Sequence, residues 1–326
     1  MKIAVLCLRP KADFDRAGAL PPPSLEVTYR GPADADVCTV MRQSAALVIP
    51  AVGPALPTAM FEGTALRLVQ VTGAGVDRLD LPMMQRLGIA VANIPGGSNG
   101  ALAEYAVTTA SVLLRRLSWA DAEIRRGNYD AFRARLLADN LAGLDGLLVG
   151  IVGLGVVGLA VAHAFHNAGC RLCYHDPAPR DSGAAEALGA RALPLGDLLA
   201  AADVVTLHVP LVPATRGLMG HRELRLMKPG AVLIQASRGG VVDEAALADL
   251  LKSGHLGGVA VDVYSTEPPP AAHPLLALEG DAARRVLLTP HIAGVTRQSA
   301  AFLLRSAWQN VERVLVANVP PQNRVV

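Results

Sequence analysis

Three side chains able to bind an anion and to move a proton follow three successive strand-like runs in the second half of the chain. The runs are Ala231–Ser237, Gly257–Val263 and Val286–Thr289, and the side chains after them are Arg238, Glu267 and His291. A guanidinium holds a carboxylate through its forked donors, and an imidazole passes a proton near neutral pH. A glutamate bonded to the other ring nitrogen would fix the tautomer of that imidazole. Each residue alone is weak evidence, because single arginines, glutamates and histidines are usually ordinary surface groups.

These residues can act together only if the three runs are strands of one parallel sheet. The carboxyl ends of parallel strands then border a single crevice, where an open α/β sheet binds its ligand. Apolar runs alternate with helical patterns and turn residues along most of the chain, which predicts this class of fold. We therefore expect Arg238, Glu267 and His291 at one edge of a parallel sheet.

The stretch Leu147–Asp176 predicts a cofactor at the same edge. An apolar run ends in Gly153, Gly155 and Gly158, a helical pattern follows, and a second apolar run ends at Asp176. This order of strand, glycine turn, helix, strand and acid is the dinucleotide-binding pattern. The first glycine permits a tight turn, the second lets a pyrophosphate approach the backbone, and the third lets helix and strand pack closely. The free N–H groups at the start of the helix would hold the phosphates.

Asp176 favours NAD over NADP as the cofactor. Its carboxylate can accept hydrogen bonds from the adenosine ribose diol and would repel a 2′-phosphate. Arg180 lies nearby and could offset part of this charge, so some use of NADPH stays open. A membrane span is the competing interpretation, because residues 146–162 carry no charge. Five glycines in that segment, with His163 and His166 directly after it, favour a globular protein instead.

The composition argues against several classes of protein. With 30 basic and 28 acidic residues, the chain offers no electrostatic case for nucleic acid or an anionic membrane as a partner. The N-terminus opens on a strand-like run without a secretory pattern, and four cysteines in 326 residues do not suggest a disulfide framework. Cys170 and Cys173 would point to opposite faces of a strand, so core thiols are expected there rather than a metal or redox pair. We expect a cytoplasmic protein without a metal site.

The first hundred residues predict a small α/β domain of their own. The strands expected in it are Ile3–Leu8, Leu25–Thr28, Ala46–Ile49, Leu68–Val71 and Ile89–Ala92. A Gly-x-Gly turn, Gly73–Gly75, follows the fourth of these strands. Consecutive backbone N–H groups in such a turn can bind a carboxylate, but an ordinary glycine turn fits the spacing equally well.

A dense group of turn residues, Asn93–Gly100, marks the expected end of this domain. After it we expect one long helix from about Ala101 to Arg126, and then a connecting segment, Gly127–Gly146. A last helix, about Thr296–Ala317, is long enough to return to the first domain.

Seven motifs spread over nearly the whole chain make it resemble the D-isomer-specific 2-hydroxyacid dehydrogenases. They are TGAGVD (Thr72–Asp77), ALAEYAV (Ala101–Val107), GLGVVG (Gly153–Gly158), LHVPLVPATRGL (Leu207–Leu218), ASRGGVVDEAAL (Ala236–Leu247), DVYSTEP (Asp262–Pro268) and TPHIAG (Thr289–Gly294). The resemblance implies two Rossmann-like domains, a doubly wound parallel-sheet NAD domain inserted in a smaller flavodoxin-like substrate domain. The substrate domain would comprise residues 1–98 and 292–326, and the dinucleotide-binding domain residues 99–291. It also implies a homodimer formed mainly through the nucleotide domains.

The resemblance further implies a role for individual residues. Arg238 would bind the substrate, and Glu267 with His291 would form the acid–base pair. Ala74 and Gly75 would offer backbone N–H groups to the substrate carboxylate, and Asp262 would contact the nicotinamide carboxamide. Other residues fall where the family lines its cofactor; these are Val156, Val157, Asp176, Pro210, Thr215, Ala236 and Gly294.

Departures from the family pattern narrow the range of expected substrates. The loop Pro50–Pro54 lacks the arginine with which phosphoglycerate-type members bind phosphate, and formate-type members lack the glutamate found here as Glu267. The hinge carries Ser98 and Asn99, one position out of step with the usual asparagine, which leaves its contacts open. We expect NADH-dependent reduction of a small unphosphorylated 2-oxo acid to the D-2-hydroxy acid, with His291 handling the proton. An NAD-sensing corepressor-like binding protein and a dehydrogenase of an unusual donor such as phosphite remain alternatives.

Overall fold

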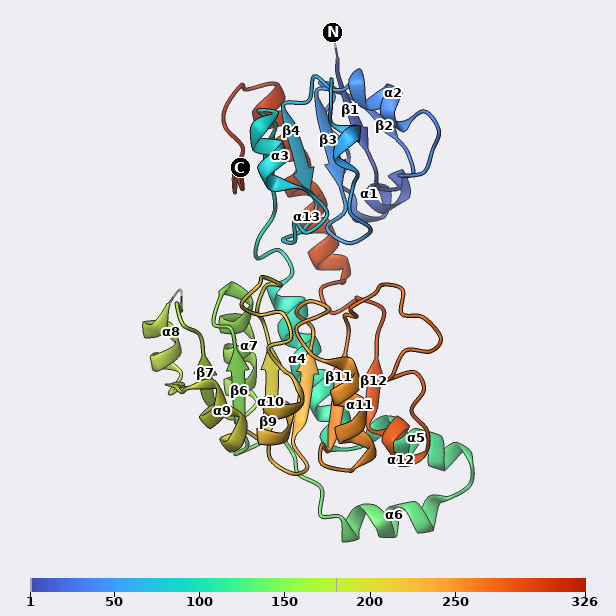
Figure 1. Ribbon diagram of the computed structural model, residues 1–326, viewed down its shortest axis with the longest axis vertical. Coiled ribbons are helices and arrows are strands. Elements are labelled where there is room, and N and C mark those ends of the chain that lie inside the picture. Colours follow the sequence, from blue (N-terminus) through green and yellow to red (C-terminus); the bar gives the residue numbers. More distant parts are fainter. Residues whose placement is uncertain (1, 180) are drawn as a thin grey trace. The chain divides into compact units, whose positions relative to one another are not determined.

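The computed structural model describes residues 2–179 and 181–326, which form two compact units (Figure 1). One unit comprises Met1–Ser98 and Val295–Val326, and the other comprises Asn99–Gly294. The chain therefore leaves the first unit, builds the second and returns. Arg180, the residue expected to offset the charge of Asp176, lies outside the described residues.

The first unit is a parallel sheet of five strands in the order β2-β1-β3-β4-β5. This is the flavodoxin-like order: β2 is added on one side of β1, and β3, β4 and β5 are then added in turn on the other side. The strands are β1 (Ile3–Cys7), β2 (Leu25–Tyr29), β3 (Ala46–Ile49), β4 (Leu68–Val71) and β5 (Ala90–Ala92). The helices are α1 (Lys11–Ala17), α2 (Val37–Arg42), α3 (Leu81–Arg86), α13 (Arg297–Leu315) and the 3-10 turn η1 (Thr58–Met60). The expected strands at β3 and β4 are confirmed with the same bounds.

The C-terminal helix α13 returns to the first unit because its apolar face packs on that sheet. Trp308 is 2% exposed, its ring centroid lies 5.0 Å from that of Phe14, and its Nε1 donates to the carbonyl of Ala19 at 3.0 Å. Thr296 caps the helix, with its hydroxyl accepting from Ser299 N–H in a capping box. The two ends of the chain thus share one core.

The second unit is a parallel sheet of seven strands in the order β12-β11-β10-β9-β6-β7-β8. Read from β8, the first six strands follow the Rossmann order 3-2-1-4-5-6, with β12 added at the far edge. The strands are β6 (Leu148–Val152), β7 (Arg171–His175), β8 (Arg191–Ala192), β9 (Val204–Leu207), β10 (Val232–Gln235), β11 (Gly258–Val261) and β12 (Val286–Leu288). The expected fold class, with two parallel-sheet α/β domains, is confirmed.

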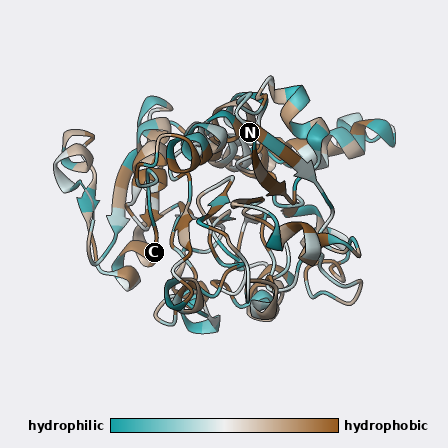
Figure 2. Cartoon of the chain, turned by 90° about the horizontal axis from the view of Figure 1, so that it is seen from above, coloured by the Kyte–Doolittle hydropathy of each residue, from teal (hydrophilic) through white to brown (hydrophobic). Residues whose placement is uncertain are grey.

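Helices cover both faces of the second sheet, and a separate apolar core lies under each layer. Cys173 belongs to one core and Cys170 to the other, and all four cysteines are free thiols. Figure 2 shows polar (teal) and apolar (brown) residues mixed along the helices of the chain. No helix in the described part of the chain is long and apolar enough to cross a membrane. The helices are α4 (Asn99–Leu114), α5 (Leu117–Arg125), α6 (Tyr129–Ala138), α7 (Val156–Asn167), α8 (Ser182–Ala187), α9 (Leu195–Ala201), α10 (His221–Leu226), α11 (Glu244–Lys252) and α12 (Gly280–Arg284).

The prediction of a single long helix from about Ala101 to Arg126 is wrong, because two helices occupy this segment. The chain turns at Arg116, whose φ of 49° is left-handed, so that α4 ends and α5 begins. The segment expected to be a simple connection instead contains the helix α6. Neither glycine nor proline marks the turn at Arg116, and the residues of α6 show no clear apolar stripe, so the sequence pattern missed both features.

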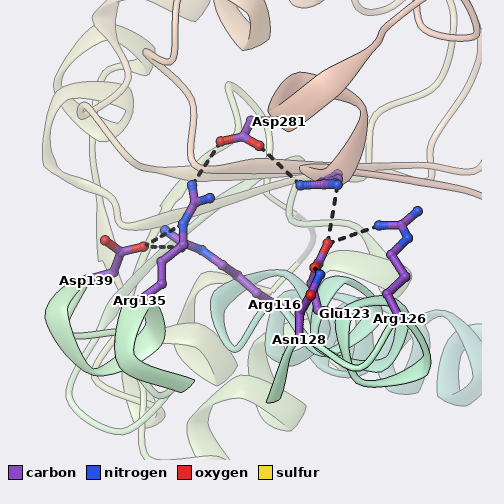
Figure 3. Close-up of polar contacts among 8 residues, drawn as sticks. Arg116, Glu123, Arg126, Asn128, Arg135, Asp139 and Asp281 are labelled. Atoms are coloured by element: carbon purple, nitrogen blue, oxygen red, sulfur yellow. Dashed lines mark hydrogen bonds and ion pairs between the residues drawn. The ribbon is translucent and has the colours of Figure 1, made fainter. Parts of the chain in front are cut away.

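Charged side chains, whose contacts are drawn in Figure 3, connect α5 and α6 to α12, and one tryptophan packs among them. Trp119 is 3% exposed, the guanidinium of Arg135 stacks 4.3 Å from its ring centroid, and Phe132 packs beside it at 5.3 Å. Arg135 also pairs with Asp281 of α12 at 2.9 Å, and Glu123 of α5 pairs with Arg284 of α12 at 3.2 Å. The Arg135–Asp281 pair is exposed on both sides and contributes little by itself, whereas the buried indole of Trp119 and the buried carboxylate of Glu123 lie where contacts stabilise more.

Candidate active site

Glu267 and His291 form a direct contact at the carboxyl edge of the second sheet. Nδ1 of His291 lies 2.8 Å from Oε2 of Glu267, and the two side chains are 29% and 26% exposed, respectively, for Glu267 and His291. The other carboxylate oxygen of Glu267 accepts from the backbone N–H of Tyr264 at 3.1 Å. Since the carboxylate can only accept, the proton of a neutral His291 lies on Nδ1, which leaves Nε2 for a reacting group.

The loop that carries His291 is fixed by Asp262. The carboxylate of Asp262 is buried and accepts from Thr289 Oγ1 at 2.5 Å, Ile292 N at 2.8 Å and Ala293 N at 2.8 Å. His291 N donates to the Asp262 carbonyl at 2.8 Å. His291 has a φ of 56°, a left-handed conformation that costs a non-glycine residue about 1 kcal/mol or more and so needs such support. Asp262 therefore positions His291, and its contact with a nicotinamide carboxamide stays a prediction.

Two hydroxyl side chains that the sequence analysis missed complete this network. The Tyr105 hydroxyl of α4 donates to Thr289 Oγ1 at 2.8 Å, and Thr289 in turn donates to Asp262. Burial raises the pKa of Tyr105 to about 12, so its hydroxyl keeps its proton and stays a donor. Tyr105 stands in the motif ALAEYAV, but the motif alone does not show that its hydroxyl meets Thr289, which lies far away in the sequence.

Arg238 lies in the turn after β10, next to the loop that carries Glu267. Gln235 Nε2 donates to the Arg238 carbonyl at 2.9 Å, and Arg238 Nη1 donates to the Ser237 carbonyl at 2.8 Å. A Cβ placed on Gly239 would lie 1.9 Å from the Tyr264 carbonyl oxygen. The turn and the loop thus pack backbone to backbone, and only glycine fits at their contact. The three strands β10, β11 and β12 are neighbours in the sheet, so Arg238, Glu267 and His291 follow adjacent strand ends.

The glycine turn after β6 has the close packing that the dinucleotide pattern requires. A Cβ on Gly153 would lie 2.5 Å from the His208 carbonyl oxygen, and one on Gly158 would lie 2.0 Å from the Gly153 carbonyl oxygen. Gly153 also has a φ of 93°, which favours glycine. By contrast, a Cβ on Gly155 would meet nothing within 4 Å, so the second glycine leaves open space beside the backbone.

The start of α7 and Asp176 fit a bound dinucleotide. Within the described residues, the first helical N–H groups, those of Val156 and Val157, donate to no acceptor, and no side chain caps the helix at Gly155. Such free donors at a helix start bind phosphate. Asp176 accepts from Leu154 N at 2.7 Å and from Ala178 N at 2.8 Å, which uses two of about four acceptor positions on a carboxylate. The remaining positions can receive ribose hydroxyl groups.

The other residues expected to line the cofactor lie at the same sheet edge. Thr215 Oγ1 donates to the Pro210 carbonyl at 2.5 Å and accepts from Val212 N at 2.9 Å, which closes the loop after β9. Ala236 directly follows β10, and Gly294 follows the His291 loop. Their contacts with NAD stay predictions.

Alanine at two glycines of the turn should separate packing from cofactor binding. Gly158→Ala is expected to lower the free energy of unfolding by about 1–3 kcal/mol, because its Cβ collides with the Gly153 carbonyl. Gly155→Ala, where the Cβ meets open space, should leave stability within about 0.5 kcal/mol and weaken NADH binding about tenfold or more. Thermal unfolding and NADH fluorescence titration measure both effects. Unchanged NADH affinity in Gly155→Ala would contradict a pyrophosphate at this turn.

His208, which follows β9 beside the glycine turn, should make stability depend on pH. Its Nε2 contacts Thr206 Oγ1 at 2.8 Å, and burial lowers its pKa from 6.5 to about 4. As the pH falls, His208 is therefore protonated in the unfolded chain before it is protonated in the folded protein. Its contribution to the free energy of unfolding is complete above about pH 6.5 and is lost as the pH falls toward 4. A shift of this size corresponds to a loss of roughly 3 kcal/mol. Urea unfolding at several pH values should show a smaller acid loss in His208→Asn than in the wild type, and equal losses would contradict the assignment.

In the first unit, the turn after β4 presents free backbone donors. Within the described residues, the N–H groups of Ala74 and Gly75 donate to no acceptor, and Asn93 Nδ2 holds the Ala74 carbonyl at 2.7 Å. A Cβ on Gly73 would lie 2.7 Å from Cβ of Ala51 in the loop after β3, so the turn and that loop touch. This geometry suits a carboxylate, although binding by Ala74 and Gly75 stays a prediction.

Two arginines that the sequence analysis did not select lie at this edge of the first unit. Arg9, after β1, contacts Thr72 Oγ1 at 3.4 Å through Nη1 and pairs with Asp13 at 2.8 Å through Nε. Arg78 is 4% exposed and donates to the carbonyls of Pro54 at 2.8 Å and Pro50 at 3.0 Å. Arg78 thus holds the loop after β3 through two backbone carbonyls, and Arg9 contacts Thr72, the residue directly before the turn.

Comparison with known proteins assigns the family. The protein-family model described as 'D-isomer specific 2-hydroxyacid dehydrogenase, NAD binding domain' matches residues 107–293 of this chain. The chain is 36% identical over 234 residues to a D-3-phosphoglycerate dehydrogenase of Archaeoglobus fulgidus, which covers 72% of this chain and 42% of the relative. It is 34% identical over 258 residues to a glyoxylate reductase of Aeropyrum pernix, which covers 78% of this chain and 75% of the relative.

A solved structure agrees over the whole chain. The TT0316 protein of Thermus thermophilus is 32% identical, with a TM-score of 0.84 over 99% of this chain and 100% of that protein. Among the described residues, no group of three or more His, Cys, Asp or Glu side chains is arranged to hold a metal ion. The chain therefore belongs to the D-isomer-specific 2-hydroxyacid dehydrogenases, and it is an NAD-dependent oxidoreductase.

Proposed function

We propose that this enzyme reduces a small unphosphorylated 2-oxo acid to the D-2-hydroxy acid, with NADH as reductant and His291 as the acid. The observation that carries the proposal is the contact of His291 Nδ1 with Glu267 at 2.8 Å, next to the Arg238 turn and on the sheet that carries the glycine turn. Bound NADH supplies the hydride. The described residues then have to hold the substrate and provide one proton.

In this proposal each residue of the trio has one task. Arg238 holds the substrate carboxylate and polarises the oxo group through its forked donors. His291 donates a proton from Nε2 to the oxygen that was the oxo group, and it takes the proton back in the oxidative direction. Glu267 stabilises the charged imidazole through Nδ1 and keeps Nε2 directed at the substrate. The N–H groups of Ala74 and Gly75 serve as further donors to the carboxylate.

A small substrate without a phosphate fits the first unit best. The loop after β3 carries no arginine, and Arg78 behind it is occupied by the carbonyls of Pro50 and Pro54. Arg9 brings one positive charge, but Asp13 offsets it, which favours a hydroxyl group over a phosphate on the substrate. The glyoxylate reductase of Aeropyrum pernix supports glyoxylate as one candidate, and hydroxypyruvate is the other.

Turnover with a panel of 2-oxo acids tests this proposal. Initial rates with NADH and NADPH should be measured for glyoxylate, hydroxypyruvate, pyruvate, phenylpyruvate, a branched-chain 2-oxo acid and 3-phosphohydroxypyruvate. We expect the highest kcat/KM with glyoxylate or hydroxypyruvate, and NADH preferred over NADPH because of Asp176. A clear preference for 3-phosphohydroxypyruvate would overturn the substrate class. Intact NADH binding without turnover of any 2-oxo acid would favour an unusual donor such as phosphite.

We further propose a cytoplasmic homodimer formed through the second unit. Large apolar side chains on α5 and α6 are exposed there, with Leu117 at 49%, Ile124 at 49%, Tyr129 at 58% and Leu137 at 65%. Figure 1 shows these helices extending away from the sheet of their unit. Sedimentation velocity should give a dimer, and Leu137→Arg should dissociate it, whereas Leu20→Arg on the first unit should not. Four free thiols support a reducing compartment.

A further inference from the structure

A contact between half-buried Glu244 and buried His273 lies next to the loop that carries Glu267. Glu244, in the first turn of α11, is 14% exposed, and His273, in the proline-rich segment after the loop, is 5% exposed. Nε2 of His273 lies 2.9 Å from Oε2 of Glu244. The orientation of the ring does not give this contact the angle of a hydrogen bond. Nδ1 of His273 accepts from Leu275 N at 3.3 Å, so the proton of the neutral ring faces the carboxylate.

This pair holds the loop between Asp262 and Glu267 at two points. Oε1 of Glu244 accepts from Ser265 N at 2.7 Å, a short bond to a residue two positions before Glu267. The ring of His273 meets the ring of Tyr264 edge to face, with centroids 5.6 Å apart at 88°. The loop has no helix or strand of its own, so these contacts replace the backbone ladder that would otherwise fix it.

Tyr264 passes this restraint to both members of the acid–base pair. Its backbone N–H holds Oε1 of Glu267 at 3.1 Å, and its hydroxyl donates to the carbonyl of Thr289 at 3.0 Å, two residues before His291. The Gly239 backbone of the Arg238 turn packs on the Tyr264 carbonyl. Displacement of Tyr264 would therefore disturb all three candidate catalytic residues.

We propose that Glu244 and His273 are positioning residues, which keep the Glu267 carboxylate on Nδ1 of His291 through Tyr264 and Ser265. The inference rests on the proposed function, because it assumes that Glu267 and His291 act as the acid–base pair. Productive geometry must be held within a few tenths of an ångström, and residues behind a catalytic group commonly change activity by about 10- to 100-fold.

Glu244→Ala should lower kcat by about tenfold or more and leave the KM for NADH within about twofold. The pH dependence of kcat/KM should change to that of Glu267→Gln. Glu244→Gln keeps an oxygen for Ser265 N and should restore most of kcat. In the Glu267→Gln background, adding Glu244→Ala should lower kcat by no more than about a further twofold. Glu244 is proposed to act through the contact between Glu267 and His291, which Glu267→Gln has already changed.

A spectroscopic readout separates positioning from a general loss of structure. The Nδ1 proton of His291, bonded to a carboxylate, should give a downfield NMR resonance, which Glu244→Ala and Glu267→Gln should both broaden or remove. Asp243→Ala is the matched control, because Asp243 caps the same helix through Ala245 N and Ala246 N. It should lower stability without moving the resonance or the pH profile. His273→Phe keeps the ring against Tyr264 and provides a second variant if Glu244→Ala does not fold.

The outcomes distinguish this inference from the proposed function. If Glu267→Gln impairs the enzyme and Glu244→Ala retains kcat and the resonance, the inference is overturned and the proposed function stands. Multiplicative losses in the double variant would also overturn it. If Glu267→Gln itself retains full kcat, the acid–base pair of the proposed function fails, and the inference fails with it.

Discussion

His291→Asn is expected to lower kcat/KM for every accepted 2-oxo acid by about 10²–10⁴-fold, the usual contribution of a positioned acid or base. Asparagine suits this test because it tolerates a left-handed backbone, so the φ of 56° at this position can be kept. Its amide can still donate to Glu267, but it cannot transfer a proton near neutral pH. Initial rates of NADH oxidation measure the loss.

The control for this variant is its fold and its cofactor affinity. The loop around His291 is held by Asp262 rather than by the imidazole, so thermal unfolding and the Kd for NADH should change little. Retention of more than about a tenth of wild-type kcat/KM in a folded His291→Asn would exclude His291 as the acid.

Arg238→Ala is expected to lower kcat/KM by about 30- to 5,000-fold, which corresponds to the roughly 2–5 kcal/mol lost when a hydrogen-bonded charge pair is truncated. Arg238→Lys should recover only part of this loss, because an ammonium group keeps the charge but cannot hold a carboxylate and an oxo group in one plane. The loss should appear in both kcat and KM, since the guanidinium is proposed to bind the substrate and to polarise it. Steady-state kinetics with glyoxylate and hydroxypyruvate provide the measurement.

Two further measurements serve as controls for Arg238→Ala: substitution of a surface arginine, and rescue of the activity by an added cation. Arg222→Ala, at an arginine whose side chain is 87% exposed on α10, should leave the kinetics unchanged. Guanidinium ions added to Arg238→Ala should restore part of the rate, because the cavity left by the side chain can hold the free ion. Near-normal activity of Arg238→Ala on all accepted 2-oxo acids would remove the central role of this residue.

The strand ends could be predicted from the sequence because parallel strands leave a strong local signal. Buried apolar runs such as Ala46–Ile49 and Val232–Gln235 end at glycine or proline turns, so the elements and the sheet edge follow from pattern alone. The glycine turn after β6 was equally predictable, since its steric demands at Gly153 and Gly158 allow no other residue.

Contacts between elements distant in sequence could not be predicted. Tyr105, Tyr264, Glu244 and His273 contact neighbours that only the folded chain supplies, and the motifs that contain the first three do not show which residues touch. Asp262 illustrates the same limit, because the three donors that its carboxylate receives from the His291 loop follow only from the folded chain, while its contact with the cofactor stays a prediction. At the break, the Arg116 guanidinium lies 5.4 Å from the Trp119 ring centroid and pairs with Asp139, contacts that left no mark in the local pattern.

The configuration of the product tests the central claim most directly. Wild-type enzyme should be incubated with NADH and hydroxypyruvate, and the glycerate formed should be resolved on a chiral column. We predict D-glycerate alone, because Arg238 at the carboxylate and His291 at the oxygen fix the orientation of the oxo group, so that hydride reaches one face of C2, and the family is specific for the D isomer. L-glycerate, a racemic product, or no product despite NADH binding would contradict it.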